Sequence, residues 1–155
     1  MRILVVTVSD RASRGEYEDR SGPAAEAALR AALTDCTVER IVVPDDEPPL
    51  RRALEKGLDY DAVVTTGGTG IGPRDITPEV SAAFCEREIP GIAEYLRSKS
   101  LKETDLAPLS RAYAGQRGST VVVNLPGSTA GARSTATLVA PLLLHAKAML
   151  AGCGH

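Results

Sequence analysis

The sequence predicts a three-layer α/β/α fold with a mainly parallel sheet. Short runs rich in valine and isoleucine alternate with longer segments of helical periodicity, the order that produces parallel strands joined by crossover helices. The first run, at residues 2–8, is apolar at nearly every position, as expected of a central strand that helices cover on both faces. A chain of 155 residues has the length of a single domain, 1–155, with a substantial core.

The elements follow one another without a repeat or a low-complexity linker. Four strands are predicted, at residues 2–8, 37–43, 62–66 and 120–124. Apolar residues at helical spacing predict helices at residues 23–33, 50–58, 78–88, 92–99 and 129–150. Ser21 and Thr77 stand where they would be N-caps of the first and third helices. Residues 100–118 predict only one helical turn, near Leu109, and Pro141 predicts a kink or break in the last helix.

A glycine-rich segment after the third strand is the most distinctive feature of the chain. Its sequence, TTGGTGIGPRDITPE at residues 65–79, ends a buried strand and begins a helix. Because glycine lets the backbone approach a ligand closely, such a junction presents its N–H groups to an anion. The segment is neither a Walker A loop nor a dinucleotide fingerprint, and a purely structural turn is the alternative. The candidate phosphate-binding residues are Thr66, Gly67, Gly68, Thr69 and Gly70.

Polar, turn-forming residues follow all four predicted strands. The carboxyl ends of parallel strands share one edge of a sheet, so segments 9–10, 44–46, 67–75 and 126–128 should meet there. Asp45 and Asp75 would then lie beside the glycine loop, and Mg²⁺ prefers one or two carboxylates together with substrate phosphates. This combination predicts magnesium-assisted phosphoryl or nucleotidyl transfer, with Arg74 as a further phosphate contact. The alternative for Asp45 is a solvated Pro-Asp-Asp turn.

The composition argues against several other classes. A net charge of −2 without a basic run gives no electrostatic case for nucleic acid. No apolar run approaches the roughly 18 residues of a membrane span. Three separated cysteines without a C-x-x-C pair argue against structural zinc or disulfides and favour a reducing, cytoplasmic location. None of them has a neighbouring histidine in sequence, and His145 and His155 are poor catalytic candidates.

Several segments resemble the molybdopterin adenylyltransferases, which include the bacterial MogA and MoaB proteins and the G domains of gephyrin-like proteins. In chain order they are VTVSDRAS, DRSGP, VVPDDE, TTGGTGIGPRDITPE, EREIPG, LSRAYAG, RGSTVVVNLPGS and LLLHAKAML. Together they extend over nearly the whole chain. The resemblance implies a homotrimer that transfers AMP from Mg-ATP to the terminal phosphate of molybdopterin and releases pyrophosphate. It also implies a molybdate-insertion protein as a possible partner.

The resemblance also implies site residues. Asp45 and Asp75 fall on the family's catalytic, Mg²⁺-binding aspartates, and residues 67–70 match the loop that handles the nucleotide and phosphates. Further matching positions are Ser9, Asp10, Ser21, Gly22, Pro126, Gly127 and Ser128. A non-catalytic molybdopterin-binding or carrier module remains an alternative, although it would not need two metal-ready carboxylates. An unrelated nucleotide-binding α/β domain is a third, and it would leave the Pro-Gly-Ser and Asp-Arg-Ser-Gly segments unexplained.

Overall fold

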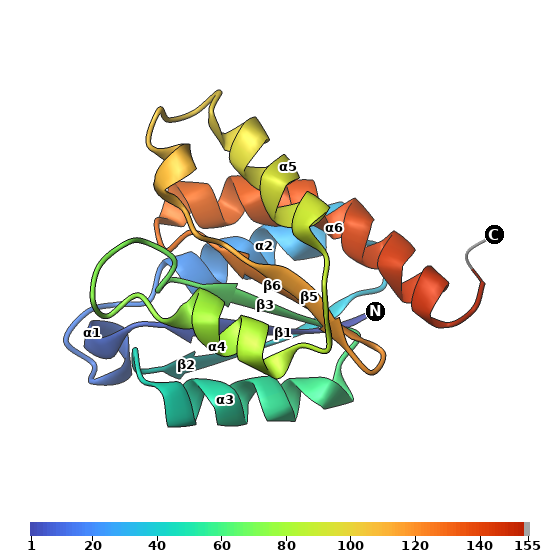
Figure 1. Ribbon diagram of the computed structural model, residues 1–155, viewed down its shortest axis with the longest axis horizontal. Coiled ribbons are helices and arrows are strands. Elements are labelled where there is room, and N and C mark those ends of the chain that lie inside the picture. The colour runs from blue at the N-terminus through green and yellow to red at the C-terminus, as the bar shows by residue number, and fades with distance from the viewer. Residues whose placement is uncertain (154–155) are drawn as a thin grey trace.

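The computed structural model describes residues 1–153 and contains a six-stranded sheet in the order β2-β1-β3-β6-β5-β4 (Figure 1). The strands are β1 (Arg2–Val8), β2 (Thr37–Val43), β3 (Ala62–Thr66), β4 (Arg87–Glu88), β5 (Ala114–Arg117) and β6 (Thr120–Leu125). β2, β1, β3 and β6 are parallel, and β5 and β4 extend the sheet in antiparallel pairing. The predicted mainly parallel sheet is therefore confirmed. His155 lies outside the described residues.

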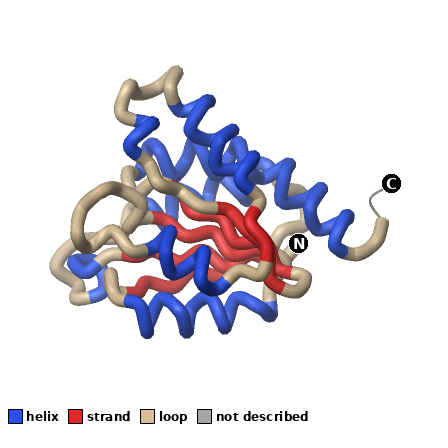
Figure 2. Tube along the Cα trace, in the orientation of Figure 1, coloured by secondary structure: helices blue, strands red, loops and turns tan. Residues whose placement is uncertain are grey.

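Helices cover both faces of this sheet (Figures 1 and 2). The helical segments are α1 (Asp10–Ser13), α2 (Ser21–Ala32), α3 (Glu47–Lys56), η1 (Gly57–Asp59), α4 (Thr77–Phe84), α5 (Pro90–Ser100), η2 (Ala107–Leu109) and α6 (Thr129–Leu150). α2, α5 and α6 lie on one face, and α3 and α4 lie on the other. This arrangement is the predicted three-layer architecture. Within residues 1–153, no helix has the length and apolar character needed to cross a bilayer.

The alternation of side chains along β1 explains its continuous apolar sequence. Ile3 and Val5 pack into the cluster under α2, α5 and α6, whereas Leu4 and Val6 pack into the cluster under α3 and α4. All four side chains are fully buried. Successive residues of a strand point to opposite faces, so a strand with helices on both sides must be apolar throughout.

Ser21 and Thr77, predicted as N-caps, are instead the first residues of α2 and α4, and the prediction is wrong. Arg20 and Ile76 occupy the N-cap positions and make no side-chain capping bond. Both hydroxyls are used for tertiary contacts, because Ser21 Oγ lies 2.8 Å from Thr66 Oγ1 and Thr77 Oγ1 donates to the carbonyl of residue 67 over 3.0 Å. These two helices are therefore anchored directly to the end of β3.

Two further details differ from the prediction, and one agrees with it. The helix expected at residues 78–88 ends at Phe84, because the chain then turns into β4, which pairs with the unpredicted strand β5. The expected helical turn near Leu109 is present as η2. Pro141 does not break α6, which runs from Thr129 to Leu150. Pro141 lies on the exposed side of α6, while buried residues on both sides of it, including Ala140 and Leu143, hold the helix against the sheet.

Candidate functional site

The loops that follow β1, β2, β3 and β6 lie together at one edge of the sheet, as the sequence predicts. These strands are parallel, so their carboxyl ends point the same way (Figure 1). Backbone hydrogen bonds join neighbouring ends. Ser9 N–H donates to Val43 O over 2.9 Å, and Gly67 N–H donates to Leu125 O over 3.3 Å. The polar residues after each strand are thereby brought into one region, which is the usual ligand-binding edge of such folds.

Asp10 and Asp45 form a reciprocal pair that joins the ends of β1 and β2. Asp10 N–H donates to Asp45 Oδ2 over 2.7 Å, and Asp45 N–H donates to Asp10 Oδ1 over 3.1 Å. The other oxygen of Asp10 accepts from Arg74 Nη2 over 2.6 Å. Asp10 therefore acts as a clamp between three loops, since both of its carboxylate oxygens are already bonded within the protein. Arg74, predicted as a phosphate contact, is held by this clamp.

The pKa values of Asp45 and Asp10 are shifted in opposite directions. Burial raises the pKa of Asp45; the hydrogen bond from Asp10 N–H opposes this shift, whereas the negative charges of Asp10 and Asp75 add to it. Burial also acts to raise the pKa of Asp10, but the hydrogen bonds from Arg74 and Asp45 N–H outweigh it and hold that pKa below its usual value. Ionisation of Asp45 is thus less favourable than that of a free aspartate, and a nearby cation would favour it.

The glycine-rich loop passes so close to its neighbours that side chains would not fit. Gly67 has φ +95°, and a Cβ there would lie 2.3 Å from the carbonyl oxygen of Val8. Gly68 has φ +63°, and a Cβ there would lie 2.3 Å from Thr77 Oγ1 and 3.4 Å from Asp45 Oδ1. Both glycines are required by conformation and by space. Asp45 therefore faces the loop backbone with one oxygen.

Asp75 is held in the outer part of the same loop. Its Oδ2 accepts from Gly72 N–H over 2.8 Å, and its own N–H donates to Gly72 O over 3.0 Å. Its negative charge contributes to the raised pKa of Asp45. Within residues 1–153, no group of three or more His, Cys, Asp or Glu side chains is arranged to hold a metal ion. Mg²⁺ usually takes only one or two protein carboxylates, because phosphates and water supply its remaining ligands.

A polar pocket of about 360 Å³ opens between these loops. The predicted site residues that line it are Ser9, Ser21, Asp45, Gly67, Gly68, Gly127 and Ser128. The other predicted residues do not line it. They are Asp10, Gly22 and Thr66 in the supporting network, Thr69, Gly70, Arg74 and Asp75 farther along the glycine-rich loop, and Pro126. The structure thus groups part of the predicted set around one cavity and leaves the rest in supporting or peripheral positions.

Asp19 is a pocket residue that the sequence analysis did not single out. Its carboxylate accepts from Thr7 Oγ1 over 2.8 Å, from Gly22 N–H over 3.0 Å and from Ser21 Oγ over 3.3 Å. A Cβ at Gly22 would lie 2.4 Å from both Asp19 Oδ2 and Thr7 Oγ1, so this network requires glycine there. The DRSGP segment was the available signal, because an aspartate side chain often accepts a hydrogen bond from the backbone N–H two or three residues later and so closes a local turn. Tyr17 also lines the pocket.

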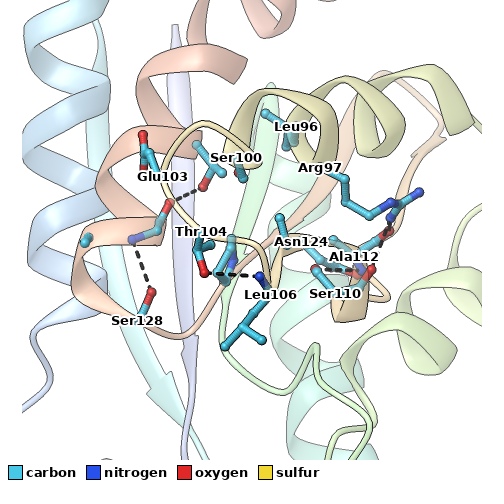
Figure 3. A pocket seen from close by; sticks show the side chains of 15 residues that line it. Leu96, Arg97, Ser100, Glu103, Thr104, Leu106, Ser110, Ala112, Asn124 and Ser128 are labelled. Atoms are coloured by element: carbon cyan, nitrogen blue, oxygen red, sulfur yellow. Dashed lines mark hydrogen bonds between the residues drawn. The ribbon is translucent and has the colours of Figure 1, made fainter.

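A second pocket, of about 370 Å³, lies between α5, the segment after it and the start of α6 (Figure 3). Pro126 and Ser128 line it, so the loop after β6 separates the two pockets and Ser128 borders both. Ser128 Oγ also caps α6 by accepting from Gly131 N–H over 3.2 Å. Arg97 lines this pocket and donates to Ala112 O over 3.0 Å. Two adjoining cavities can hold two parts of a ligand or two substrates.

Neither the three cysteines nor His145 lines either pocket. Burial raises the pKa of the Cys85 thiol to about 11, which leaves it protonated and a poor nucleophile at neutral pH. His145 is exposed on α6, away from the residues that line the two cavities.

Comparisons with known proteins give the family. Residues 4–145 match the family described as a probable molybdopterin binding domain. The chain is 38% identical over 156 residues to a molybdopterin adenylyltransferase of Helicobacter pylori, covering 98% of this chain and 89% of that protein. It is 34% identical over 145 residues to the molybdenum cofactor synthesis protein cinnamon of Drosophila melanogaster, covering 92% of this chain but only 24% of that longer protein.

A solved structure gives the same relationship. The crystal structure of the molybdopterin biosynthesis enzyme MoaB from Thermus thermophilus superposes with a TM-score of 0.87 at 40% identity. It covers 97% of this chain and 96% of that one. The strand order, the glycine loop and the two pockets described above thus occur in a chain whose sequence and fold both match one family. The chain belongs to the molybdopterin-binding domain family.

Proposed function

We propose that this protein is a molybdopterin adenylyltransferase of molybdenum cofactor biosynthesis. The observation that carries the proposal is its 38% identity, over nearly its whole length, to a protein of that name. A phosphate oxygen of molybdopterin would attack the α-phosphorus of ATP. The bond from that phosphorus to the bridging oxygen would break, and pyrophosphate would leave with the electron pair. The products are adenylyl-molybdopterin and pyrophosphate.

The geometry of the two pockets supports this reaction. The polar pocket beside residues 67–68 offers backbone groups and hydroxyls to a nucleotide phosphate chain, and the adjoining pocket has room for the pterin. Ser128 borders both cavities, where the two substrates would meet. Asp45 and Asp75 would hold Mg²⁺, which neutralises phosphate charge when it is bound. The raised pKa of Asp45 supports this assignment, because a cation favours the ionised carboxylate.

Pyrophosphate release from Mg-ATP, with and without molybdopterin, tests the proposal. In Asp45→Asn and Asp75→Asn the amide oxygen can still accept the hydrogen bonds from Asp10 N–H and Gly72 N–H, so the fold should persist. We expect pterin-dependent release from the wild type and at least about a 10²-fold loss of kcat in each variant. Asp46→Asn is the matched control, because Asp46 caps α3 and asparagine caps equally well.

The same experiment separates the enzyme from the carrier alternative. Wild-type protein that binds molybdopterin tightly but releases no pyrophosphate would be a binding module, and the proposed activity would be wrong. Unchanged pyrophosphate release in Asp45→Asn and Asp75→Asn would show that the protein has the activity but that these two residues do not contribute to it.

We also propose that the protein is a homotrimer in the cytoplasm. Exposed apolar side chains near the end of α6 support self-association, and they are Leu142, Leu144, Met149 and Leu150. Light scattering at micromolar concentration should then give three times the chain mass of 16.3 kDa. A monomer would contradict the proposal.

A further inference from the structure

Arg111, in the segment between η2 and β5, contacts the glycine-rich loop from outside the two pockets. Its backbone N–H donates to Thr69 O over 2.9 Å. Its side chain then reaches along the glycine-rich loop, where Nε donates to Gly70 O over 2.6 Å and Nη2 donates to Asp75 O over 2.5 Å. Nη1 is paired with Glu79 in the first turn of α4. Arg111 therefore contacts the glycine-rich loop at Thr69 and Gly70 and again at Asp75, and it also contacts the helix that follows the loop.

The loop between these contacts has few other attachments. Ile71, Pro73 and Arg74 are exposed, and Ile71 has 72% of its surface accessible to solvent. Apart from those of Arg111, the hydrogen bond or ion pair that joins residues 71–75 to another segment of the described chain is Arg74–Asp10. The bonds between Gly72 and Asp75 close the turn internally but do not fix it to the rest of the protein. The position of Asp75 relative to Asp45 consequently depends on the Arg111 contacts and on the Arg74–Asp10 pair.

We propose that Arg111 is a positioning residue, which sets the location of the Asp75 carboxylate by tethering the backbone on both sides of the 71–74 turn. The inference rests on the proposed adenylyl transfer. Arg111 acts through carbonyl groups and so requires the planar guanidinium, whose donors point in several fixed directions. A lysine at this position keeps the charge but cannot reach Gly70 O, Asp75 O and Glu79 together.

Arg111→Lys tests the proposal, with Arg117→Lys as the control. Arg117 lies in the neighbouring strand β5 and also donates to a carbonyl, that of Phe84 over 2.7 Å, but it does not contact the glycine-rich loop. We expect kcat for pyrophosphate release to fall about 10²-fold in Arg111→Lys with KM for ATP nearly unchanged, because misplacing a carboxylate that holds Mg²⁺ at the reacting phosphates lowers kcat. Arg117→Lys should keep the wild-type kcat. Guanidinium ion added to Arg111→Ala should restore part of the activity, whereas urea should not.

Amide hydrogen exchange provides a second measurement that does not depend on activity. Gly72 and Asp75 N–H groups should exchange at least tenfold faster in Arg111→Lys than in the wild type or Arg117→Lys, while amides of β1 and β3 keep their protection. Equal exchange in all three proteins would overturn the tether, and so would a raised KM with an unchanged kcat. If the wild type releases no pyrophosphate, the proposed function fails, and the exchange measurement alone decides the role of Arg111.

Discussion

Replacing Gly67 by alanine should destabilise the protein by about 2–5 kcal/mol. A residue with a side chain at φ +95° costs roughly 1–2 kcal/mol. The new Cβ would also lie 2.3 Å from the Val8 carbonyl oxygen, well below the 3.0 Å under which such contacts essentially never occur. The backbone at the end of β1 must therefore move, and forced overpacking of this kind costs about 1–3 kcal/mol more.

Substitutions at two other glycines allow the conformational cost and the steric cost to be measured separately. Gly118 has φ +55° but nothing within 4 Å of a Cβ, so Gly118→Ala should show only the conformational cost, about 1 kcal/mol. Gly91 lies in α5 without a positive φ and also has open space around it, so Gly91→Ala should be neutral or stabilising by up to about 1 kcal/mol.

Urea denaturation of the three variants and the wild type measures these differences as free energies of unfolding. The displaced end of β1 carries Ser9 and Asp10, so Gly67→Ala should also lower pyrophosphate release far more than Gly118→Ala. A Gly67→Ala variant no less stable than Gly118→Ala would refute the reasoning, because the contact with Val8 would then have no energetic consequence.

Three further predictions concern single residues. Asp45→Asn should melt at a higher temperature than the wild type at pH 7 in the absence of metal, because the raised pKa of Asp45 means that its ionised form destabilises the folded state. The difference in melting temperature should vanish below about pH 4, where the carboxyl group is protonated in the unfolded chain as well. Equal melting temperatures at pH 7 and below pH 4 would contradict this prediction. Asn124→Ala should cost about 2–4 kcal/mol in urea unfolding, because the fully buried Nδ2 donates to Thr65 Oγ1 and Ser81 Oγ, each over 2.9 Å. Pro141→Ala should raise the free energy of unfolding by about 1–2 kcal/mol, because alanine restores a helical N–H on an exposed face, and a loss of stability would show that the proline is needed.

The strands of the parallel sheet and the glycine loop were predictable because their signals are local. Continuous apolar runs identify β1 and β3, and the glycines after β3 mark a backbone that must approach its neighbours closely. Parallel pairing then places the strand ends on one edge, so the neighbourhood of Asp45 and the glycine loop followed from topology alone. β5 gave no such signal, since its sequence AGQR is short and lacks branched apolar residues.

The hydrogen bonds of the Ser21 and Thr77 hydroxyl groups could not be predicted from local sequence patterns. Each was expected to precede its helix as the capping residue. Each is instead the first residue of the helix, and its hydroxyl forms a hydrogen bond at the end of β3. No property of the helix sequence distinguishes these two outcomes.

The sequence by itself determined the layers of this protein, its parallel strands and the edge at which its candidate site lies, because periodicity and glycine content act over a few residues. Only the tertiary structure decided what the polar side chains at that edge do. Asp10 pairs with Asp45 across 35 residues of chain, and Arg111 reaches Gly70 across 41. Such contacts form when packing of the sheet and helices brings distant loops within hydrogen-bond distance, and this depends on the whole fold.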